Sequence, residues 1–184
     1  MRSVYCALIH HPVKDRTGET ITTAVTNLDV HDLARSARTF DLRAYFVVTP
    51  ISAQRAITER IVHHWTGGRA RIPQRTPAME RIRVAESLEA AVDSIKYEAG
   101  APELVATAAR STGRELTTFG EERARLDTDG PPVLLLFGTG YGLADAALDR
   151  ADRLLEPIAG RGGAPFNHLS VRAAFAIVLD RLLG

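Results

Sequence analysis

A glycine-rich turn, Phe-Gly-Thr-Gly-Tyr-Gly at 137–142, is the segment whose residue types could most directly bind a ligand. It follows the apolar run 133–137 and precedes a helical pattern over 144–150. Glycines let backbone amides approach a ligand closely, and the N-terminus of the following helix carries partial positive charge. The turn therefore predicts a nucleotide or nucleoside site, with a purely structural tight turn as the alternative.

The spacing of the glycines separates three kinds of nucleotide site. A nicotinamide fingerprint needs Gly-x-Gly-x-x-Gly, whereas this chain has Gly-x-Gly-x-Gly. Open-sheet methyltransferases use the observed spacing with an acid after the next strand, where Glu156 stands. However, such turns follow the first strand of a domain, and only 28 residues follow Glu156. A phosphate loop needs Gly-Lys-Ser/Thr, and no lysine is near.

A second group of residues lies near the C-terminus. Leu-Glu-Pro-Ile at 155–158 and Asn-His-Leu-Ser-Val at 167–171 precede an alanine-rich helical pattern. Together with the glycine turn, they resemble the SPOUT superfamily of methyltransferases, α/β proteins with a deep trefoil knot near the C-terminus. Over the whole chain, including segments 8–13, 26–39 and 46–50, the sequence is similar to a small bacterial SPOUT family of S-adenosylmethionine-dependent RNA methyltransferases.

The resemblance implies a site for S-adenosyl-L-methionine made by three loops of the knot. Such sites hold the adenine mainly by backbone donors and acceptors between apolar walls, and the three loops are poor in charge. The resemblance also implies an RNA substrate and a homodimer through the knot region. The implied cofactor-binding residues are Thr107, Ala108, Phe137, Gly138, Thr139, Gly140, Gly142, Leu155, Glu156, Pro157, Ile158, His168, Leu169 and Ser170.

Asn27 and Arg35 resemble the Asn and Arg of the first motif of SpoU-type 2′-O-ribose methyltransferases, where the Arg helps to activate the ribose hydroxyl. The resemblance therefore implies that these two residues are catalytic. They are eight residues apart, two more than in the usual SpoU pattern. Thr139-Gly140-Tyr141 replaces the second-motif Glu, and His168 stands near the third-motif Asn, so the 2′-O-ribose specificity is not implied. The structural alternatives are a helix cap at Asn27 or Asp29 and a surface ion pair at Arg35.

The stretch 68–83 is the most basic part of a chain whose net charge is only +1. It carries five arginines against the single acid Glu80, and a guanidinium can grip phosphate with a planar fork of donors. A solvated loop, rich in arginine because of base composition, is the alternative. The candidate RNA contacts are Arg38, Arg69, Arg71 and Arg75.

Histidine pairs and the lone cysteine bear on metal sites. Adjacent residues on a strand or a helix diverge, so neither His10-His11 nor His63-His64 is expected to chelate a metal alone. Cys6 is the single cysteine, which excludes an internal disulfide framework and a cysteine zinc site. We therefore expect no metal site. Trp65 is expected either to stack on a base or to pack in the core.

The elements that must position these residues alternate along the chain, which predicts a mainly parallel sheet with helices on both faces. We expect one α/β domain over 1–184, and the resemblance adds a knot region at about 104–184. Strands are expected over 4–9, 44–48, 82–85, 104–107, 133–137 and 153–155, helices over 27–37, 52–65, 88–98, 119–126, 144–150 and 169–183, and a long irregular connection over 66–81.

Composition sets the broad class of protein. The chain has 184 residues, 45% of them hydrophobic and 24% charged, which is an ordinary globular balance. No apolar run approaches the roughly 18 residues of a membrane-spanning helix, and the apolar N-terminal run is too short for a signal peptide. We therefore expect a cytoplasmic protein with no membrane segment.

The sequence thus predicts a homodimeric, knotted enzyme that transfers a methyl group from S-adenosylmethionine to a nucleotide in structured RNA, either tRNA or rRNA. Two alternatives stay open. One is a catalytically silent module that binds S-adenosylmethionine, and the other is a methyltransferase that acts on a protein or a small molecule.

Replacement of Arg69, Arg71 and Arg75 together should make RNA binding less sensitive to salt. Each arginine that neutralises a phosphate releases counterions, so fewer such contacts give a flatter plot of log affinity against log salt. The measurement is RNA affinity of the wild type and the triple variant across a salt series. An unchanged slope would remove the 68–83 stretch from RNA binding.

Overall fold

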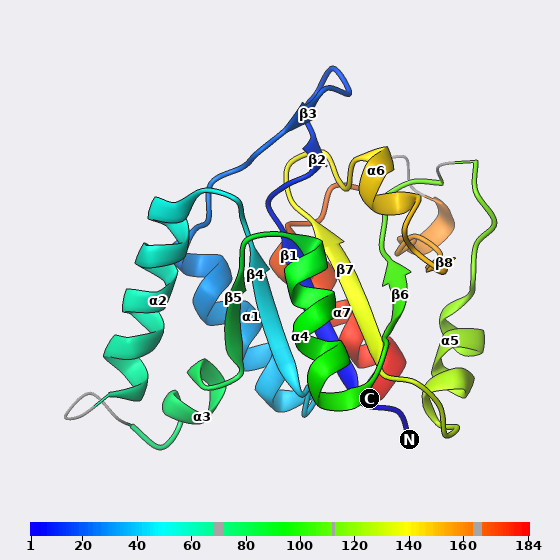
Figure 1. The fold of residues 1–184 in the computed structure, drawn as a ribbon. Coiled ribbons are helices and arrows are strands. Elements are labelled where there is room, and N and C mark those ends of the chain that lie inside the picture. The colour runs from blue at the N-terminus through cyan, green and yellow to red at the C-terminus, as the bar shows by residue number, and fades with distance from the viewer. Residues whose placement is uncertain (68–71, 112, 164–166) are drawn as a thin grey trace.

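Six parallel strands form one sheet in the order β5-β4-β1-β7-β6-β8 (Figure 1). The computed structural model describes residues 1–67, 72–111, 113–163 and 167–184. The mainly parallel sheet, with strands and helices that alternate along the chain, is confirmed. The strands are β1 Val4–Ile9, β4 Ala44–Val48, β5 Ile82–Ala85, β6 Glu103–Ala106, β7 Val133–Gly138 and β8 Arg153–Leu154.

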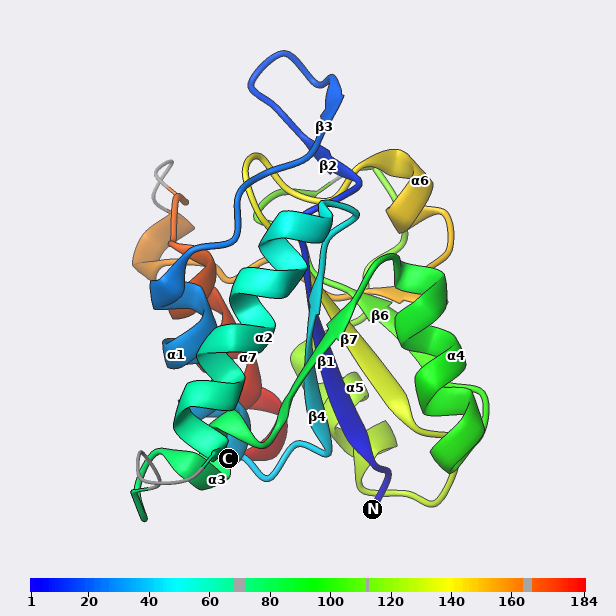
Figure 2. The same cartoon turned by 60° about the vertical axis from the view of Figure 1, so that its left-hand side comes forward.

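Helices cover both faces of the sheet (Figure 2). One core contains buried residues of α1, α3, α5 and α7, and the other contains those of α4 and α6. Residues of the central strands alternate between the two cores, so that Cys6 and Leu8 of β1 face one layer while Ala7 and Ile9 face the other. The helices are α1 Asn27–Thr39, α2 Ser52–Thr66, α3 Thr76–Met79, α4 Leu88–Ala99, α5 Phe119–Leu126, α6 Asp145–Leu148 and α7 Val171–Leu183.

The centre of the sheet is the pair β1 and β7. The two strands pair in parallel from Val4 with Val133 to Ile9 with Gly138. Every residue of β1 and all but the last residue of β7 are buried. Strands buried on both faces need continuous apolar sequence, and for that reason the apolar runs alone predict both strands.

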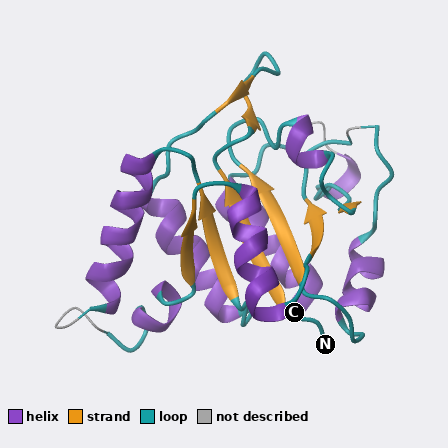
Figure 3. Ribbon diagram, viewed as in Figure 1, coloured by secondary structure: helices purple, strands orange, loops and turns teal. Residues whose placement is uncertain are grey.

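A hairpin and a short helix were absent from the sequence prediction. A two-stranded hairpin, β2 Val13–Lys14 with β3 Thr20–Ile21, projects beyond the carboxyl ends of the main strands (Figure 3). The short helix α3 lies within the connection that was expected to be irregular, and its Ala78 and Met79 are buried. Strands of two residues and a helix of four are too short to produce a periodic pattern.

Helix α1 begins with a different cap from the one expected. Thr26 is the capping residue, because its Oγ1 accepts a hydrogen bond from the Asp29 amide at 3.2 Å. Neither Asn27 nor Asp29 serves as the cap. The Asp29 carboxylate is thereby left for other contacts.

Residues 104–184 hold β6 to β8 together with α5, α6 and α7. The trefoil knot and the single domain over 1–184 stay predictions. None of the helices within the described ranges is both long enough and apolar enough to cross a membrane.

Candidate functional site

A cavity of about 730 Å³ lies at the carboxyl ends of the central strands. This is the edge at which open parallel sheets bind ligands. Its walls come from the loops after β6, β7 and β8, from the start of α7, and from the chain between β1 and α1. These loops gather along the upper edge of the molecule in Figure 1.

The structure brings thirteen of the fourteen predicted cofactor-binding residues to this one cavity. Pro157 is the exception, since it does not line the cavity. Their role in binding a cofactor stays a prediction. The lining residues among them are Thr107, Ala108, Phe137, Gly138, Thr139, Gly140, Gly142, Leu155, Glu156, Ile158, His168, Leu169 and Ser170.

The glycine turn is folded too tightly for a side chain at its first position. A Cβ on Gly138 would lie 2.5 Å from the Leu143 amide nitrogen, and real Cβ atoms essentially never approach so closely. Gly140 and Gly142 have φ angles of +61° and +104°, in the region that favours glycine. The glycines are therefore required by the shape of the turn.

Backbone hydrogen bonds join the glycine turn to the hairpin. The Lys14 amide donates to the Gly142 carbonyl at 2.8 Å, and the Tyr141 amide donates to the Lys14 carbonyl at 3.0 Å. The Lys14 ammonium also pairs with Asp145 at 2.9 Å. The hairpin thus fixes the position of one cavity wall, a link that the sequence pattern did not reveal.

The other two loops are held together by Asn167. Its Nδ2 donates to the carbonyls of Ala109 and Ile158, at 2.7 and 2.9 Å. Glu156 turns its Oε1 to the amide of Phe119 at 2.8 Å, so this carboxylate caps the start of α5. The Glu156 carboxylate therefore has a structural hydrogen bond to α5, although the residue also lines the cavity.

The cavity suits S-adenosylmethionine where the loops after β6, β7 and β8 line it. The walls there combine apolar side chains, such as Leu143, Leu155 and Ile158, with exposed backbone of the glycine turn. Apolar walls with a few polar groups at fixed positions are typical of cofactor pockets of this size. Gly138 has no side chain, and a Cβ at this position would collide with the Leu143 amide. No side-chain atom of residue 138 therefore covers the backbone of the turn.

Polar side chains from the N-terminal part of the chain form another part of the wall. Lys14, Thr23, Thr26, Asp29 and Arg172 line the cavity, and none of them is among the site residues predicted from the sequence. One signal was present: Asp29 lies six residues before Arg35, which is the usual spacing of the SpoU pattern. Asn27, at a spacing of eight, is exposed and does not line the cavity.

A hydrogen-bond chain runs from the buried His10 to the glycine turn. His10 Nδ1 lies 3.0 Å from Thr23 Oγ1, which contacts Thr139 Oγ1, and Thr139 donates to the Ile9 carbonyl at 3.0 Å. Each hydroxyl has one proton, so the chain requires His10 to donate from Nδ1. Burial lowers the pKa of His10 to about 4, so the ring is neutral at pH 7.

Arg35 lies away from the cavity within its own chain. It is exposed and stands eight residues after Asn27, about 12 Å further along the axis of α1. The structure therefore brings neither predicted catalytic residue into the cavity of the same chain.

The predicted RNA contacts lie on other parts of the surface. Arg38 is exposed and pairs with Asp41 at 3.3 Å. Arg75 lies over the ring of Trp65, 4.5 Å from its centroid, and His31 meets the same ring edge-on. Trp65 therefore packs between helices. Arg69 and Arg71 fall outside the described residues.

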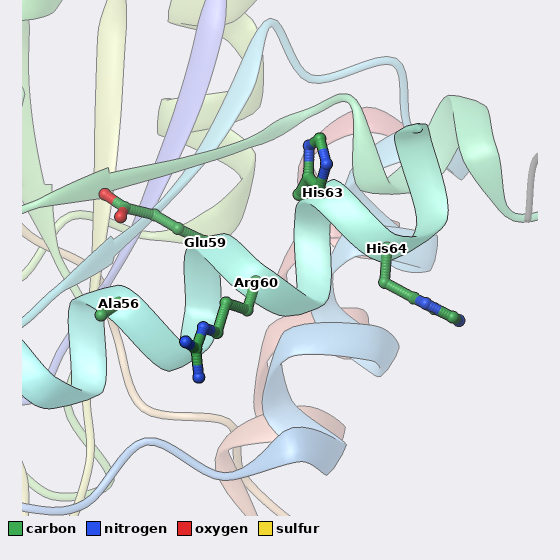
Figure 4. Close-up of a pocket in the computed structure, with 5 residues that line it drawn as sticks. All are labelled: Ala56, Glu59, Arg60, His63 and His64. Carbon is green, nitrogen blue, oxygen red and sulfur yellow. The ribbon is translucent and has the colours of Figure 1, made fainter. Parts of the chain in front are cut away.

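A shallow hollow of about 460 Å³ also lies on the outer side of α2, where Ala56, Glu59, Arg60, His63 and His64 line it (Figure 4). One helix alone cannot enclose a ligand, so we assign the site to the cavity at the strand ends. His63 and His64 point in different directions, as the helical geometry requires. Within the described ranges, no three His, Cys, Asp or Glu side chains gather as metal ligands would.

Gly138→Ala should weaken binding of S-adenosylhomocysteine by about tenfold or more, a loss of about 1.4 kcal/mol. The new Cβ would force the turn away from Leu143 and disturb the cavity wall. Calorimetric titration measures the affinity, and thermal unfolding checks the fold. Gly160→Ala is the matched control, because its Cβ would meet nothing within 4 Å. Equal affinity in the two variants would show that the turn does not contact the cofactor.

Solved structures share this fold at low sequence identity. A methylase family protein from Haemophilus influenzae superposes with a TM-score of 0.64 at 16% identity, covering 98% of this chain and 65% of that one. TrmJ from Z. mobilis gives a TM-score of 0.59 at 15% identity, covering 99% and 68%. The SpoU methyltransferase AviRb from Streptomyces viridochromogenes, solved with AdoMet, gives 0.53 at 15% identity, covering 99% and 57%. The α/β fold of SPOUT methyltransferases is thus confirmed.

Relatives by sequence match the whole chain. A tRNA (guanine-N(1)-)-methyltransferase of Oleidesulfovibrio alaskensis is 41% identical over 186 residues, and the match covers all of this chain but 42% of that protein. An uncharacterized protein of Aquifex aeolicus is 38% identical over 185 residues, which is 99% of this chain and 89% of that one.

The chain therefore spans less than half the length of the first of these relatives, whose name describes the longer protein. A family model described as SAM-dependent RNA methyltransferase matches residues 3–184. With the fold, the cavity and the motifs in agreement with that match, the chain belongs to this family of SAM-dependent RNA methyltransferases, whose cofactor is S-adenosylmethionine.

Proposed function

We propose that this chain transfers a methyl group from S-adenosylmethionine to a nucleotide of a structured RNA. The observation that carries the proposal is the convergence of three loops, far apart in the sequence, on one cavity at the carboxyl ends of the strands. Apolar walls, a glycine turn and a polar wall in the same cavity provide for a cofactor and for a reacting group beside it.

We further propose that the RNA is tRNA. The support is the name of relatives more than 40% identical to this chain, tRNA (guanine-N(1)-)-methyltransferase. Only the class of substrate is taken from that name, because the match covers 42% of each relative. The methylated atom in that name, guanine N1, refers to the longer proteins and is not transferred to this chain.

S-adenosylmethionine supplies a methyl group on a positively charged sulfur, and the acceptor must approach that carbon in line with the bond to sulfur. The contribution of the chain is to align the two groups, which can supply several kcal/mol. The glycine turn, fixed by the hairpin, and the loops joined by Asn167 hold one partner in place. The polar wall with Thr26, Asp29 and Arg172 is where the acceptor is held.

RNA binding is assigned to arginines outside the cavity. The candidate phosphate contacts are Arg38, Arg75 and the two arginines at 69 and 71. Phosphate contacts position the RNA without reading its bases, so they can lie outside the cavity. We also propose a homodimer through the knot region, in which Arg35 serves the cavity of the second copy, and action in the cytoplasm. Arg35 supports this arrangement because it is exposed and away from its own cavity.

A silent cofactor-binding module is the second candidate. The observation that favours it is that neither Asn27 nor Arg35 lines the cavity. A silent module would bind the cofactor and transfer nothing.

Purified protein should bind S-adenosylmethionine and S-adenosylhomocysteine saturably and respond weakly, if at all, to ATP and NADH. It should also transfer labelled methyl groups to tRNA from cells that lack it. The measurements are calorimetric titration and methyl transfer to fractionated RNA. Binding without transfer to any RNA would favour the silent module, and transfer to a protein fraction would favour a different substrate class.

Arg35→Ala should lower methyl transfer to RNA by about a hundredfold, within the usual range for loss of a catalytic group, and leave cofactor affinity unchanged. The reason is that Arg35 lies outside the cofactor cavity of its own chain, so its proposed role is toward the RNA. Arg125→Ala, on the exposed side of α5, is the control. If both variants retain full activity, Arg35 has no catalytic role.

A further inference from the structure

Asp29 is a buried acid at the wall of the cavity. Its exposed fraction is 5%, although the neighbouring residues Asn27 and Leu28 are exposed. Burying a carboxylate costs free energy unless the charge is paired and hydrogen-bonded. Asp29 lies in the first turn of α1. The N-termini of α1 and α7 both lie beside the cavity.

Among the residues that the structure describes, each carboxylate oxygen of Asp29 has one hydrogen-bond partner. Arg172 Nη1 donates to Oδ1 at 3.0 Å, and Thr26 Oγ1 donates to Oδ2 at 2.6 Å. An ionised carboxylate offers about four acceptor positions, so two partners leave capacity for a further donor. Because Thr26, Asp29 and Arg172 all line the cavity, a bound acceptor can supply that donor.

The buried groups behind Asp29 carry no charge at pH 7. Burial lowers the pKa of His10 to about 4, against the opposing attraction of Asp29. Burial also raises the pKa of Tyr45 well above its ordinary value, with a further rise from the charge of Asp29. Within the described ranges, the charged groups linked to Asp29 are Arg172, which pairs with it, and Asp32, which contacts the same arginine at 3.5 Å.

We propose that Asp29 is a catalytic residue that accepts the proton of the methyl-accepting group, and that this group is an O–H or N–H of the RNA. This inference rests on the proposed function. In the step, the acceptor atom forms a bond to the methyl carbon while the carbon–sulfur bond breaks. The electron pair of that bond goes to sulfur, which becomes a neutral thioether, and the acceptor proton goes to the Asp29 carboxylate. Arg172 and Thr26 orient the carboxylate.

RNA acceptors differ in whether the methylated atom carries a proton. A ribose hydroxyl or a protonated ring nitrogen has a proton to lose, so it gains from a nearby base. A ring nitrogen with a free lone pair reacts without one. A methyltransferase that needs Asp29 therefore acts on an acceptor of the first kind.

Asp29→Asn should lower kcat for methyl transfer to tRNA by about a hundredfold or more, the range for loss of a general base. The dissociation constant for S-adenosylhomocysteine should stay unchanged. Asp32→Asn is the matched control: it removes an acid from the same helix and the same arginine, but Asp32 is exposed and does not line the cavity. Its kcat should stay within about a factor of two, as expected for an exposed pair.

A second variant separates catalysis from folding. Asp29→Glu keeps a carboxylate near Arg172 and should restore part of the activity that Asp29→Asn loses. A structural ion pair with Arg172 would also favour Glu over Asn, but its loss would lower the unfolding temperature and the affinity for S-adenosylhomocysteine together with kcat, whereas loss of the base lowers kcat alone. Thermal unfolding of each variant checks the fold. Full kcat in Asp29→Asn, or equal losses in the Asn and Glu variants, would overturn the proposal while wild-type transfer still supports the proposed function. Absence of wild-type transfer to any RNA would overturn both.

Discussion

The parallel pairing of β1 with β7 positions both the hydrophobic cores and the cavity. It joins two strands that lie about 130 residues apart in the chain, in a register that sets Ile9 beside Gly138. This register brings His10, at the end of β1, to the glycine turn that follows β7. The same pair forms the boundary between the two hydrophobic cores, because each strand buries alternate residues in each of them.

The cavity is built from this pairing outward. The turn after β7 is fixed on one side by the hairpin through Lys14 and on the other by Thr139, which donates to the Ile9 carbonyl. The chain that leaves the hairpin then reaches Thr26, where α1 begins with Asp29 facing Arg172 of α7. A backbone turn suited to a cofactor and a polar wall suited to an acceptor are thus positioned by one network of hydrogen bonds.

The polar groups around the start of α1 differ in charge: His10 and Tyr45 are neutral, whereas Asp29 and Arg172 form an ion pair. His10 and Tyr45 are fully buried, and desolvation shifts the pKa of each toward the neutral form. Asp29 keeps a charged partner, Arg172, at the cavity wall. Asp29 is buried, but the Arg172 side chain is 34% exposed, so desolvation and solvent screening leave the pair little net stabilising effect. Its position beside the cavity supports the proposed role at the site.

The strands, the long helices and the glycine turn follow from the amino-acid sequence alone, because continuous apolar runs, helical spacing and glycine are local signals. The other loops that line the cavity were implied by the resemblance to the SPOUT superfamily. The sequence did not reveal the hairpin or α3, which are too short to be periodic, or Thr26 as the cap of α1. Which polar residues line the cavity depends on how α1 and α7 pack against each other. Asn27 and Asp29 are two residues apart, yet one is exposed and the other buried against Arg172, a partner 143 residues away. Whether a helical side chain is buried depends on what packs against that face of the helix, and for Asp29 that neighbour comes from the far end of the chain.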